Sequence, residues 1–315
     1  MLLVAFTLPC PEGQVKYCSF AEYFTDVNHI FEFLDYGIYL REVTLPTDDP
    51  DFKMVQDNNN KWRANKIILG ARYNLADVST FQYLIDHGVD ILANDDSAIR
   101  WASEHGHSEI VRFLISKNGD IHAINDYAIR YASKNGHLDV IKILIKHDAN
   151  ICENNNSAIK SASEYGHLEI IKILTTYGAD IHTGNNYAVR YASKNGYLNV
   201  VQFLITKGAY IHADDNYAVR LASCYGHLDV VQFLISKGAN IHAKNDFAIR
   251  WASQYGYLDV VKILTEHGAD IHANNNDALK LALEYGHSEV AKFLISKAGN
   301  ITSFKGCSIY NFQNG

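Results

Sequence analysis

The chain has 315 residues, of which 48% are hydrophobic and 20% are charged, and its formal net charge is −7. The apolar content excludes general disorder, and the negative balance argues against a nucleic-acid-binding protein, which would carry a basic excess. The five cysteines are widely spaced and include no C-x-x-C pair, so neither a disulfide framework nor a zinc site is indicated, and a reducing, intracellular setting is expected.

The start of the chain carries no recognisable targeting signal. Met1 to Pro9 is apolar but short, and it lacks a basic region and a small-residue cleavage site. No stretch of the chain reaches the ~18 consecutive apolar residues that a membrane span needs. We therefore expect a soluble protein without a membrane partner.

Residues 1–60 are predicted to form a small α+β segment. Alternating residues predict a strand from Tyr39 to Leu45, and a turn at Pro50 leads to a second strand from Phe52 to Val55. An amphipathic helix is predicted over residues 21–35, on the apolar positions Phe24, Val27, Ile30, Phe31 and Leu34.

A repeat of 30 residues dominates the rest of the chain. Ile91, Ala102, Gly106 and Leu114 each recur at every thirtieth position up to the end of the repeats. This register implies stacked copies of one supersecondary unit, each unable to bury its apolar face alone. The seven full copies are 91–120, 121–150, 151–180, 181–210, 211–240, 241–270 and 271–300, which together fill residues 91–300.

The two ends of the array are atypical, as the terminal copies of such arrays usually are. Residues 61–90 are predicted to be a degenerate leading repeat, because Phe81 to Gly88 match the second half of the unit. Residues 301–315 begin an eighth copy at Ile301 and stop, so they are predicted to be a partial repeat or tail.

Residues 211–240 predict a unit of helix, turn, helix and tight loop. In the polar turn that opens this copy, Asp215 or Asn216 can cap the first helix. Gly226 and Gly238 are predicted to end the two helices in the left-handed conformation. Small side chains that allow close helix packing lie on one face of the first helix, at Ala218, Val219, Ala222 and Ser223.

The second half of this unit, G-H-L-D-V-V-x-x-L-I-x-x-G-A-N, resembles the ankyrin repeat closely, and it recurs in all seven copies. The first half departs from that family, because Tyr-Ala-Val-Arg at 217–220 stands where ankyrin repeats carry Thr-Pro-Leu-His. The period is 30 residues instead of the family's 33, and the missing residues fall before the first helix. The projecting finger loops of the family should therefore be shorter here.

The Tyr-Ala-Ile/Val-Arg openings and the leading stretch YLREVTLPTDDPDFKMVQD resemble ankyrin proteins encoded by giant amoeba-infecting viruses of the mimivirus type. This resemblance implies an all-α solenoid of ankyrin repeats behind a small α+β N-terminal segment. It also implies a non-catalytic protein–protein interaction scaffold, monomeric and in the host cytoplasm, that binds a protein partner in a concave groove. No cofactor, metal or nucleic acid is expected as a ligand.

Ten of the fifteen histidines occupy only two repeat positions. Copies in neighbouring repeats are separated by the helix spacing, roughly 10 Å, which is too far for a shared metal ion. Structural hydrogen bonding is predicted for them instead. The sequence also contains no nucleophile–base set and no glycine-rich phosphate loop, so an enzyme is not expected.

A ladder of cations recurs in the first helices, and it has two interpretations. These side chains either bridge neighbouring loops or form a stripe for acidic partners. Glutamates such as Glu104 neutralise the cation one turn earlier in some copies, whereas Lys134 and Lys194 double the positive charge. An acidic docking site is therefore predicted near Arg130/Lys134 and Arg190/Lys194. The ladder consists of Arg100, Arg130, Lys160, Arg190, Arg220, Arg250 and Lys280.

Aromatic residues fill 12 of 21 places in a stripe along the first helices, against 12% in the whole chain. The stripe takes three positions per helix, each four residues after the last. It either lines a binding groove, where Tyr and Trp are favoured, or fills gaps that the shortened loops leave. The partner-binding hypothesis names Trp101, Tyr131, Tyr165, Tyr191, Tyr225, Trp251, Tyr255 and Tyr285, together with Arg130, Lys134, Arg190 and Lys194.

A narrower alternative is a viral substrate adaptor that recruits a host ubiquitin ligase. Some viral ankyrin proteins do this through a C-terminal helical module, for which the residues after the array are too few. An enzymatic site in residues 1–60 is the least favoured reading, because that segment is too small for an independent enzyme core.

Overall fold

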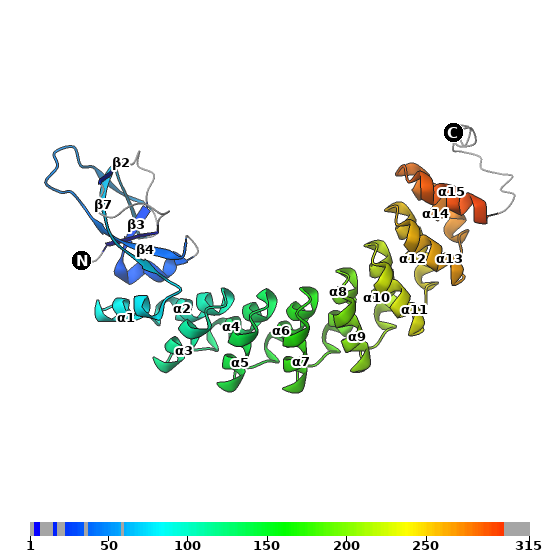
Figure 1. Cartoon of the computed structure of the whole chain (residues 1–315), viewed down its shortest axis with the longest axis horizontal. Helices are drawn as coiled ribbons and strands as arrows, with labels where there is room; N and C mark the ends of the chain where they lie inside the picture. Colours follow the sequence, from blue (N-terminus) through cyan, green and yellow to red (C-terminus); the bar gives the residue numbers. More distant parts are fainter. Residues whose placement is uncertain (1–2, 7–14, 18–22, 35–36, 58–59, 299–315) are drawn as a thin grey trace. The chain divides into compact units, whose positions relative to one another are not determined.

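The computed structural model describes residues 3–6, 15–17, 23–34, 37–57 and 60–298. The chain falls into two compact units, residues 1–161 and residues 162–315. The first unit holds a β-sheet and the leading helices, and the second holds the remaining repeats (Figure 1). The predicted tail 301–315 lies outside the described residues.

The N-terminal part of the first unit is a seven-stranded antiparallel sheet, drawn in blue in Figure 1. The strands lie in the order β2-β7-β4-β1-β3-β6-β5. The strand predicted at Tyr39 is confirmed as β4, and the strand predicted at Phe52 begins two residues later, as β5. The seven strands are β1 (Leu3–Phe6), β2 (Val15–Tyr17), β3 (Tyr23–Asp26), β4 (Tyr39–Thr44), β5 (Met54–Asp57), β6 (Lys61–Ala64) and β7 (Lys66–Asn74).

The α-helix predicted over residues 21–35 is wrong for the described part of that range. Tyr23–Asp26 is strand β3, and Val27–Glu32 forms a 3-10 helix, η1. Strand β3 pairs with β1 on one side and β6 on the other, and these ladder hydrogen bonds outweigh the helical spacing of the apolar residues. Phe24 and Ile30 are nonetheless buried, as their place in the apolar pattern required.

The sheet also takes in the first half of the predicted leading repeat. Strands β6 and β7 lie within residues 61–74 and pair with β3, β5, β4 and β2, so only the second half of the degenerate leading repeat is helical. The second half is present as helix α1 (Val78–Asp86). The core of the sheet is formed by Phe24, Val43, Ala64, Ile67 and Leu69.

Each repeat from residue 91 onward contains two helices joined by a turn, which confirms the predicted unit. In each unit the first helices lie in one row and the second helices in another (Figure 1). The first helices are α2 (Ala93–Glu104), α4 (Ala123–Asn135), α6 (Glu153–Glu164), α8 (Thr183–Lys194), α10 (Ala213–Cys224), α12 (Ala243–Gln254) and α14 (Ala273–Glu284). The second helices are α3 (Ser108–Ser116), α5 (Leu138–Lys146), α7 (Leu168–Thr176), α9 (Leu198–Thr206), α11 (Leu228–Ser236), α13 (Leu258–Glu266) and α15 (Ser288–Lys297).

Small apolar side chains hold neighbouring first helices together. Ala218 and Ala222 of α10 are at most 1% exposed, and α10 packs against both α8 and α12. Val231 and Leu234 of α11 are fully buried beneath the same helix. Burial of these apolar surfaces between copies is the main stabilising term in a repeat array.

A left-handed turn of three residues opens every first helix. All of these residues except Ile124 and Lys244 are Asn, Asp or Gly, for which a positive φ costs least. The capping role predicted for Asn216 is wrong, because its side-chain oxygen accepts a hydrogen bond from the backbone N–H of Asn240, at 2.8 Å, and not from its own helix. The turns are Asn94–Asp96, Ile124–Asp126, Asn154–Asn156, Gly184–Asn186, Asp214–Asn216, Lys244–Asp246 and Asn274–Asn276.

Candidate partner-binding surface

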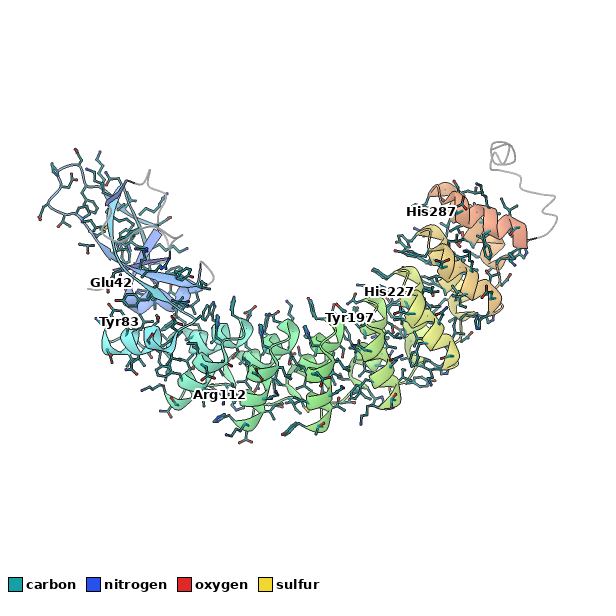
Figure 2. The ribbon with its side chains drawn as sticks, viewed as in Figure 1. Glu42, Tyr83, Arg112, Tyr197, His227 and His287 are labelled. Carbon is teal, nitrogen blue, oxygen red and sulfur yellow. The ribbon has the colours of Figure 1, made fainter. Side chains whose placement is uncertain are left out.

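Most of the repeated histidines make structural hydrogen bonds, as the sequence predicted. His212 Nδ1 lies 2.8 Å from Asn216 Oδ1, at the end of the left-handed turn. A histidine at the second repeated position, His227, lies with its Nε2 2.8 Å from the carbonyl oxygen of Lys194 in the preceding repeat (Figure 2). Among the described residues, no group of three or more His, Cys, Asp or Glu side chains is placed to hold a metal ion.

The rings at this second position lie directly on the glycine that ends the preceding first helix. A Cβ atom on Gly196 would lie 2.5 Å from Nδ1 of His227, and one on Gly166 would lie 2.7 Å from the ring of Tyr197 (Figure 2). Gly196 has a φ of 77°, so both its conformation and its lack of a side chain are needed. Such contacts, made by the same close approach at Gly106, Gly166, Gly196, Gly226 and Gly256, fix the ends of these first helices against the next repeat.

The ladder arginines bind the left-handed turns of their own repeats. Arg130 donates from Nε to the carbonyl of Asn125, at 2.9 Å, and from Nη2 to that of Ile124, at 3.1 Å. The same pair of bonds is made by Arg100, Arg220 and Arg250. These four arginines therefore hold two carbonyl groups of their own turn, whereas the structural interpretation predicted bridges between neighbouring loops. Side-chain bridges to the next repeat are made by Arg190, to Asp214, and by Arg250, to Asp277.

The first two positions of the aromatic stripe pack within the array. Tyr127 and Tyr131 stack with ring centroids 3.9 Å apart, and Lys134 places its ammonium 5.5 Å from the Tyr131 ring. The Tyr127 hydroxyl donates to Glu104 of the preceding helix at 2.6 Å. Burial, followed by this hydrogen bond, raises the pKa of Tyr127. These half-buried tyrosines fill space between helices, which favours the packing explanation for them.

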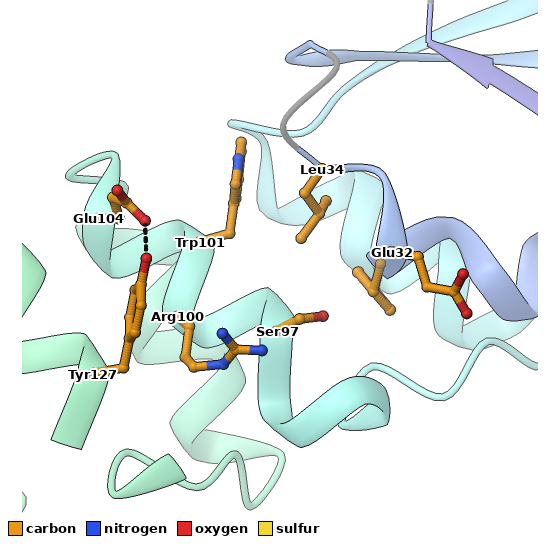
Figure 3. A pocket seen from close by; sticks show the side chains of 8 residues that line it. Glu32, Leu34, Ser97, Arg100, Trp101, Glu104 and Tyr127 are labelled. Carbon is orange, nitrogen blue, oxygen red and sulfur yellow. Dashed lines mark hydrogen bonds between the residues drawn. The ribbon is translucent and has the colours of Figure 1, made fainter. Parts of the chain in front are cut away.

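Trp101 does not offer the exposed surface that the binding hypothesis needs. It is only 4% exposed, since η1 packs against α2. Its ring lines a pocket of about 420 Å³, and Figure 3 shows Trp101 and Leu34 facing the same space. The pocket is lined by Phe31, Glu32, Leu34, Ser97, Arg100, Trp101, Glu104 and Tyr127.

The third position of the stripe is exposed. In the second unit, Tyr225, Tyr255 and Tyr285 follow the ends of α10, α12 and α14 and are 46%, 45% and 54% exposed. We name these three residues the tyrosine row. Partial desolvation raises the pKa of Tyr255, and the neighbouring Cys224 thiol and the row's other two tyrosines add to that rise. Tyr165, the corresponding residue of α6, is also 46% exposed.

The remaining predicted residues occupy intermediate positions. Trp251 is half-buried. Its ring stacks on Phe247, with centroids 4.9 Å apart, and lies tilted against Tyr255 at 5.9 Å. Tyr191 stacks on Tyr187 at 3.9 Å. Lys194 lies with its ammonium 5.5 Å from the Tyr191 ring. The structure thus brings the predicted residues together within each first helix, but it leaves only the third position open to solvent.

Two exposed tyrosines were missed by the sequence reasoning. Tyr177 is 62% exposed after α7, and Tyr210 is 57% exposed in the loop before α10. Tyr210 is the last residue of its repeat, and the other repeats up to residue 270 end in Asp or Asn at that position. This departure from the pattern could have identified Tyr210 as a candidate from the sequence.

A carboxylate that joins the sheet to α1 was also missed. Glu42 of β4 accepts hydrogen bonds from the hydroxyls of Tyr83, at 2.6 Å, and Tyr73, at 2.7 Å (Glu42 and Tyr83 are labelled in Figure 2). These two bonds hold the pKa of Glu42 below its usual value. The three residues come from separate elements, so no spacing in the sequence indicates that they meet.

None of the helices in the described parts of the chain combines the length and apolar character that crossing a membrane requires. Comparison with known proteins gives the family. A family model of ankyrin repeats in three copies matches residues 121–185, 182–245 and 219–305, and a single ankyrin repeat model matches residues 94–126.

Relatives are found in Acanthamoeba polyphaga mimivirus. One protein named as an ankyrin repeat protein is 52% identical over 95 residues, which is 29% of this chain and 31% of that protein. A second is 44% identical over 91 residues, which is 29% of this chain and 44% of that protein. The aligned stretches thus span less than half the length of either relative.

The fold is found among solved structures as well. The ankyrin repeat domain of human ASB11 superposes with a TM-score of 0.56 at 20% identity, covering 63% of this chain and 96% of that one. The similarity to ASB11 concerns the fold alone, whereas the family models cover most of the repeats. The chain belongs to the ankyrin repeat family, whose repeats are a general protein–protein interaction module.

Proposed function

We propose that this chain is a non-catalytic scaffold that binds a protein partner through the first helices of its second unit, with the tyrosine row at the centre of the contact. The observation that carries the proposal is the exposure of Tyr225, Tyr255 and Tyr285 beside helix positions that are fully buried. Tyrosine buries a large area for little loss of side-chain freedom, and it is enriched at binding hot spots. Ankyrin repeat proteins are generally non-catalytic, which agrees with this role.

The area of the row sets its share of the interface. A buried tyrosine removes about 150–250 Å² from water, so three that are already half-covered supply roughly 300 Å² together. A standard interface buries about 800 Å² on each side. The partner must therefore also contact neighbouring residues of the same helices, and half-buried Trp251, whose ring lies against Tyr255, is the first of these.

Recruitment of a host ubiquitin ligase stays a prediction. It is a special case of partner binding, and nothing among the described residues favours a ligase subunit over another protein. Host cytoplasm as the location, and a monomeric state, likewise remain predictions.

The test is an affinity capture from Acanthamoeba lysate, followed by mass spectrometry. The intact chain is compared with a variant carrying Tyr225→Ala, Tyr255→Ala and Tyr285→Ala. The matched control carries Tyr177→Ala and Tyr210→Ala, which removes exposed tyrosines outside the row. We expect a partner that the control retains and the row variant loses, with equal helical content by circular dichroism. A partner that both variants retain, or that both lose, would contradict the proposal.

A further inference from the structure

The array contains the same arrangement of side chains twice, once in each compact unit. In the first unit, Tyr127 and Tyr131 of α4 stack at 3.9 Å, and the Lys134 ammonium lies 5.5 Å from the outer ring. In the second unit, Tyr187 and Tyr191 of α8 stack at 3.9 Å, with Lys194 at 5.5 Å. The inner tyrosine of each pair donates to a glutamate, Glu104 or Glu164, of the preceding first helix.

The two arrangements differ in what covers the ladder arginine. Arg190 Nη1 lies 2.7 Å from Oδ2 of Asp214, which comes from the left-handed turn of the next repeat. The residue at the same repeat position after Arg130 is Asn154. Arg130 uses Nε and Nη2 for its own turn, and no carboxylate among the described residues pairs with it.

A second arginine shows which group this position accepts. Arg250 Nη1 lies 2.7 Å from Oδ2 of Asp277, again in the next repeat. Both arginines covered in this way are largely buried, with side-chain exposures of 12% for Arg190 and 14% for Arg250. Arg250 fixes Nε and Nη2 on its own turn, as Arg130 does, so its Nη1 group is held in one orientation, which suits a carboxylate.

We infer that Arg130 binds an acidic side chain of the protein partner, in the place where Asp214 covers Arg190. The inference rests on the proposed function in that the array binds proteins. It gives α4, in the first unit, a ligand chemistry of its own, an aspartate- or glutamate-bearing segment, as a contact separate from the one at the tyrosine row of the second unit. Lys134, one turn further along the helix, adds a second positive charge on this face. Glu104 of the preceding first helix accepts a hydrogen bond from the Tyr127 hydroxyl. The sequence favoured Arg190 equally as a site for an acidic partner. It is excluded as such a site because Asp214 of this chain already occupies the position of the partner's carboxylate.

The structure provides a reciprocal pair of substitutions. Asn154 has φ 49° and ψ 50°, and Asp214 has φ 52° and ψ 52°, so each backbone accepts the other side chain without rearrangement. Asn154→Asp should supply an internal carboxylate to Arg130, and Asp214→Asn should remove the one on Arg190. The control is Asn154→Gly, since Gly184 already occupies this repeat position in another copy.

The measurement is fluorescence anisotropy of a labelled glutamate homopeptide, titrated with the full chain at low salt, with a glutamine homopeptide of the same length as the neutral probe. We expect Asn154→Asp to weaken glutamate-peptide binding roughly fivefold, the loss of one partly buried ion pair. Asp214→Asn should add a second site, and Asn154→Gly should bind like the wild type.

The inference is overturned if the wild type does not prefer the glutamate peptide, or if Asn154→Asp and Asn154→Gly bind it alike. It is also overturned if a double-stranded DNA fragment binds more tightly than the peptide and is lost in the same variant. These outcomes leave the proposed function intact as long as the partner captured from lysate still depends on the tyrosine row. Loss of that dependence, with peptide binding unchanged, would overturn the proposed function instead.

Discussion

Neighbouring positions along the first helices differ in two ways: in how much the residue varies between repeats, and in how exposed its side chain is to solvent. Ala222 and Gly226 stand at positions that hold Ala and Gly in all seven repeats, and we name these two positions, with that of Arg220, the frame. The frame is buried or fixed by the next repeat, whereas Tyr225, one residue before Gly226, is 46% exposed and is replaced by His or Asn in other copies. The positions that set the fold and the position proposed for recognition are therefore neighbours along the chain.

The difference follows from how a repeat array is stabilised. Each copy contacts only its neighbours, so a change in the frame disturbs two interfaces. A change at an exposed position disturbs none, and that position can vary without loss of the fold. This difference between frame positions and exposed positions can be tested directly with substitutions that change either the stability of the fold or the binding of a partner, but not both.

The largest effect is expected at Gly226. Gly226→Ala should lower the free energy of unfolding by about 2–4 kcal/mol, because the residue has a φ of 79° and its new Cβ would lie 2.5 Å from the Tyr257 ring. Gly238→Ala is the control, since its φ is 87° but no atom lies within 4 Å of the added Cβ. Gly238→Ala should lower the free energy of unfolding only by the cost of placing alanine in a left-handed backbone conformation, about 1 kcal/mol. Urea unfolding followed by circular dichroism measures the free energy of unfolding of both variants. Equal losses of stability would show that the ring of Tyr257 in the next repeat does not obstruct the added Cβ.

A smaller loss of stability is expected from a substitution at Arg220. This side chain is 6% exposed and donates hydrogen bonds to the carbonyls of Asp214 and Asp215. Arg220→Met keeps the apolar stem but removes both donors, and should cost about 1–2 kcal/mol. Arg100→Met removes the same two bonds at a site open to water, and it should cost less. The same unfolding experiment compares them. If the two variants lose equal stability, burial does not set the strength of these bonds.

The junction between the sheet and α1 should depend on pH. The folded pKa of Glu42 is lowered by the Tyr83 and Tyr73 hydroxyls, so its contribution to stability is complete above the unfolded pKa and disappears as the pH falls through the folded one. The melting temperature of the sheet, followed by Trp62 fluorescence, should therefore drop as the solution is acidified below about pH 4. Glu42→Gln should reduce that dependence, and an unchanged slope would show that another carboxylate causes it.

The frame could be predicted from the sequence, because its residues recur at a fixed spacing and only a stacked helix pair satisfies that spacing. The sequence named four of the tyrosines that are exposed, Tyr165, Tyr225, Tyr255 and Tyr285, but it also named Trp101, whose burial depends on η1. That element was not predicted, because the strand pairing of Tyr23–Asp26 is a long-range interaction that local spacing does not reveal. The Arg–carbonyl bonds were missed for a related reason. They require three consecutive left-handed residues, and the Asn-rich stretches indicate a turn without specifying that conformation.

The smallest effect on stability, and the sharpest separation from binding, is expected within the tyrosine row. Tyr285→Ala removes a side chain that is 54% exposed, so the free energy of unfolding should change by less than about 0.5 kcal/mol. Tyr255 lies in the middle repeat of the row, and its ring centroid is 5.9 Å from that of Trp251, so it is the residue that a partner would surround most completely. Hot spots lie near the centre of an interface, where neighbouring contacts exclude water. Tyr255→Ala should therefore weaken binding of the captured partner at least tenfold, more than either Tyr225→Ala or Tyr285→Ala. Calorimetric titration of the three single variants ranks them, and a larger loss at Tyr225 would move the centre of the interface toward α10.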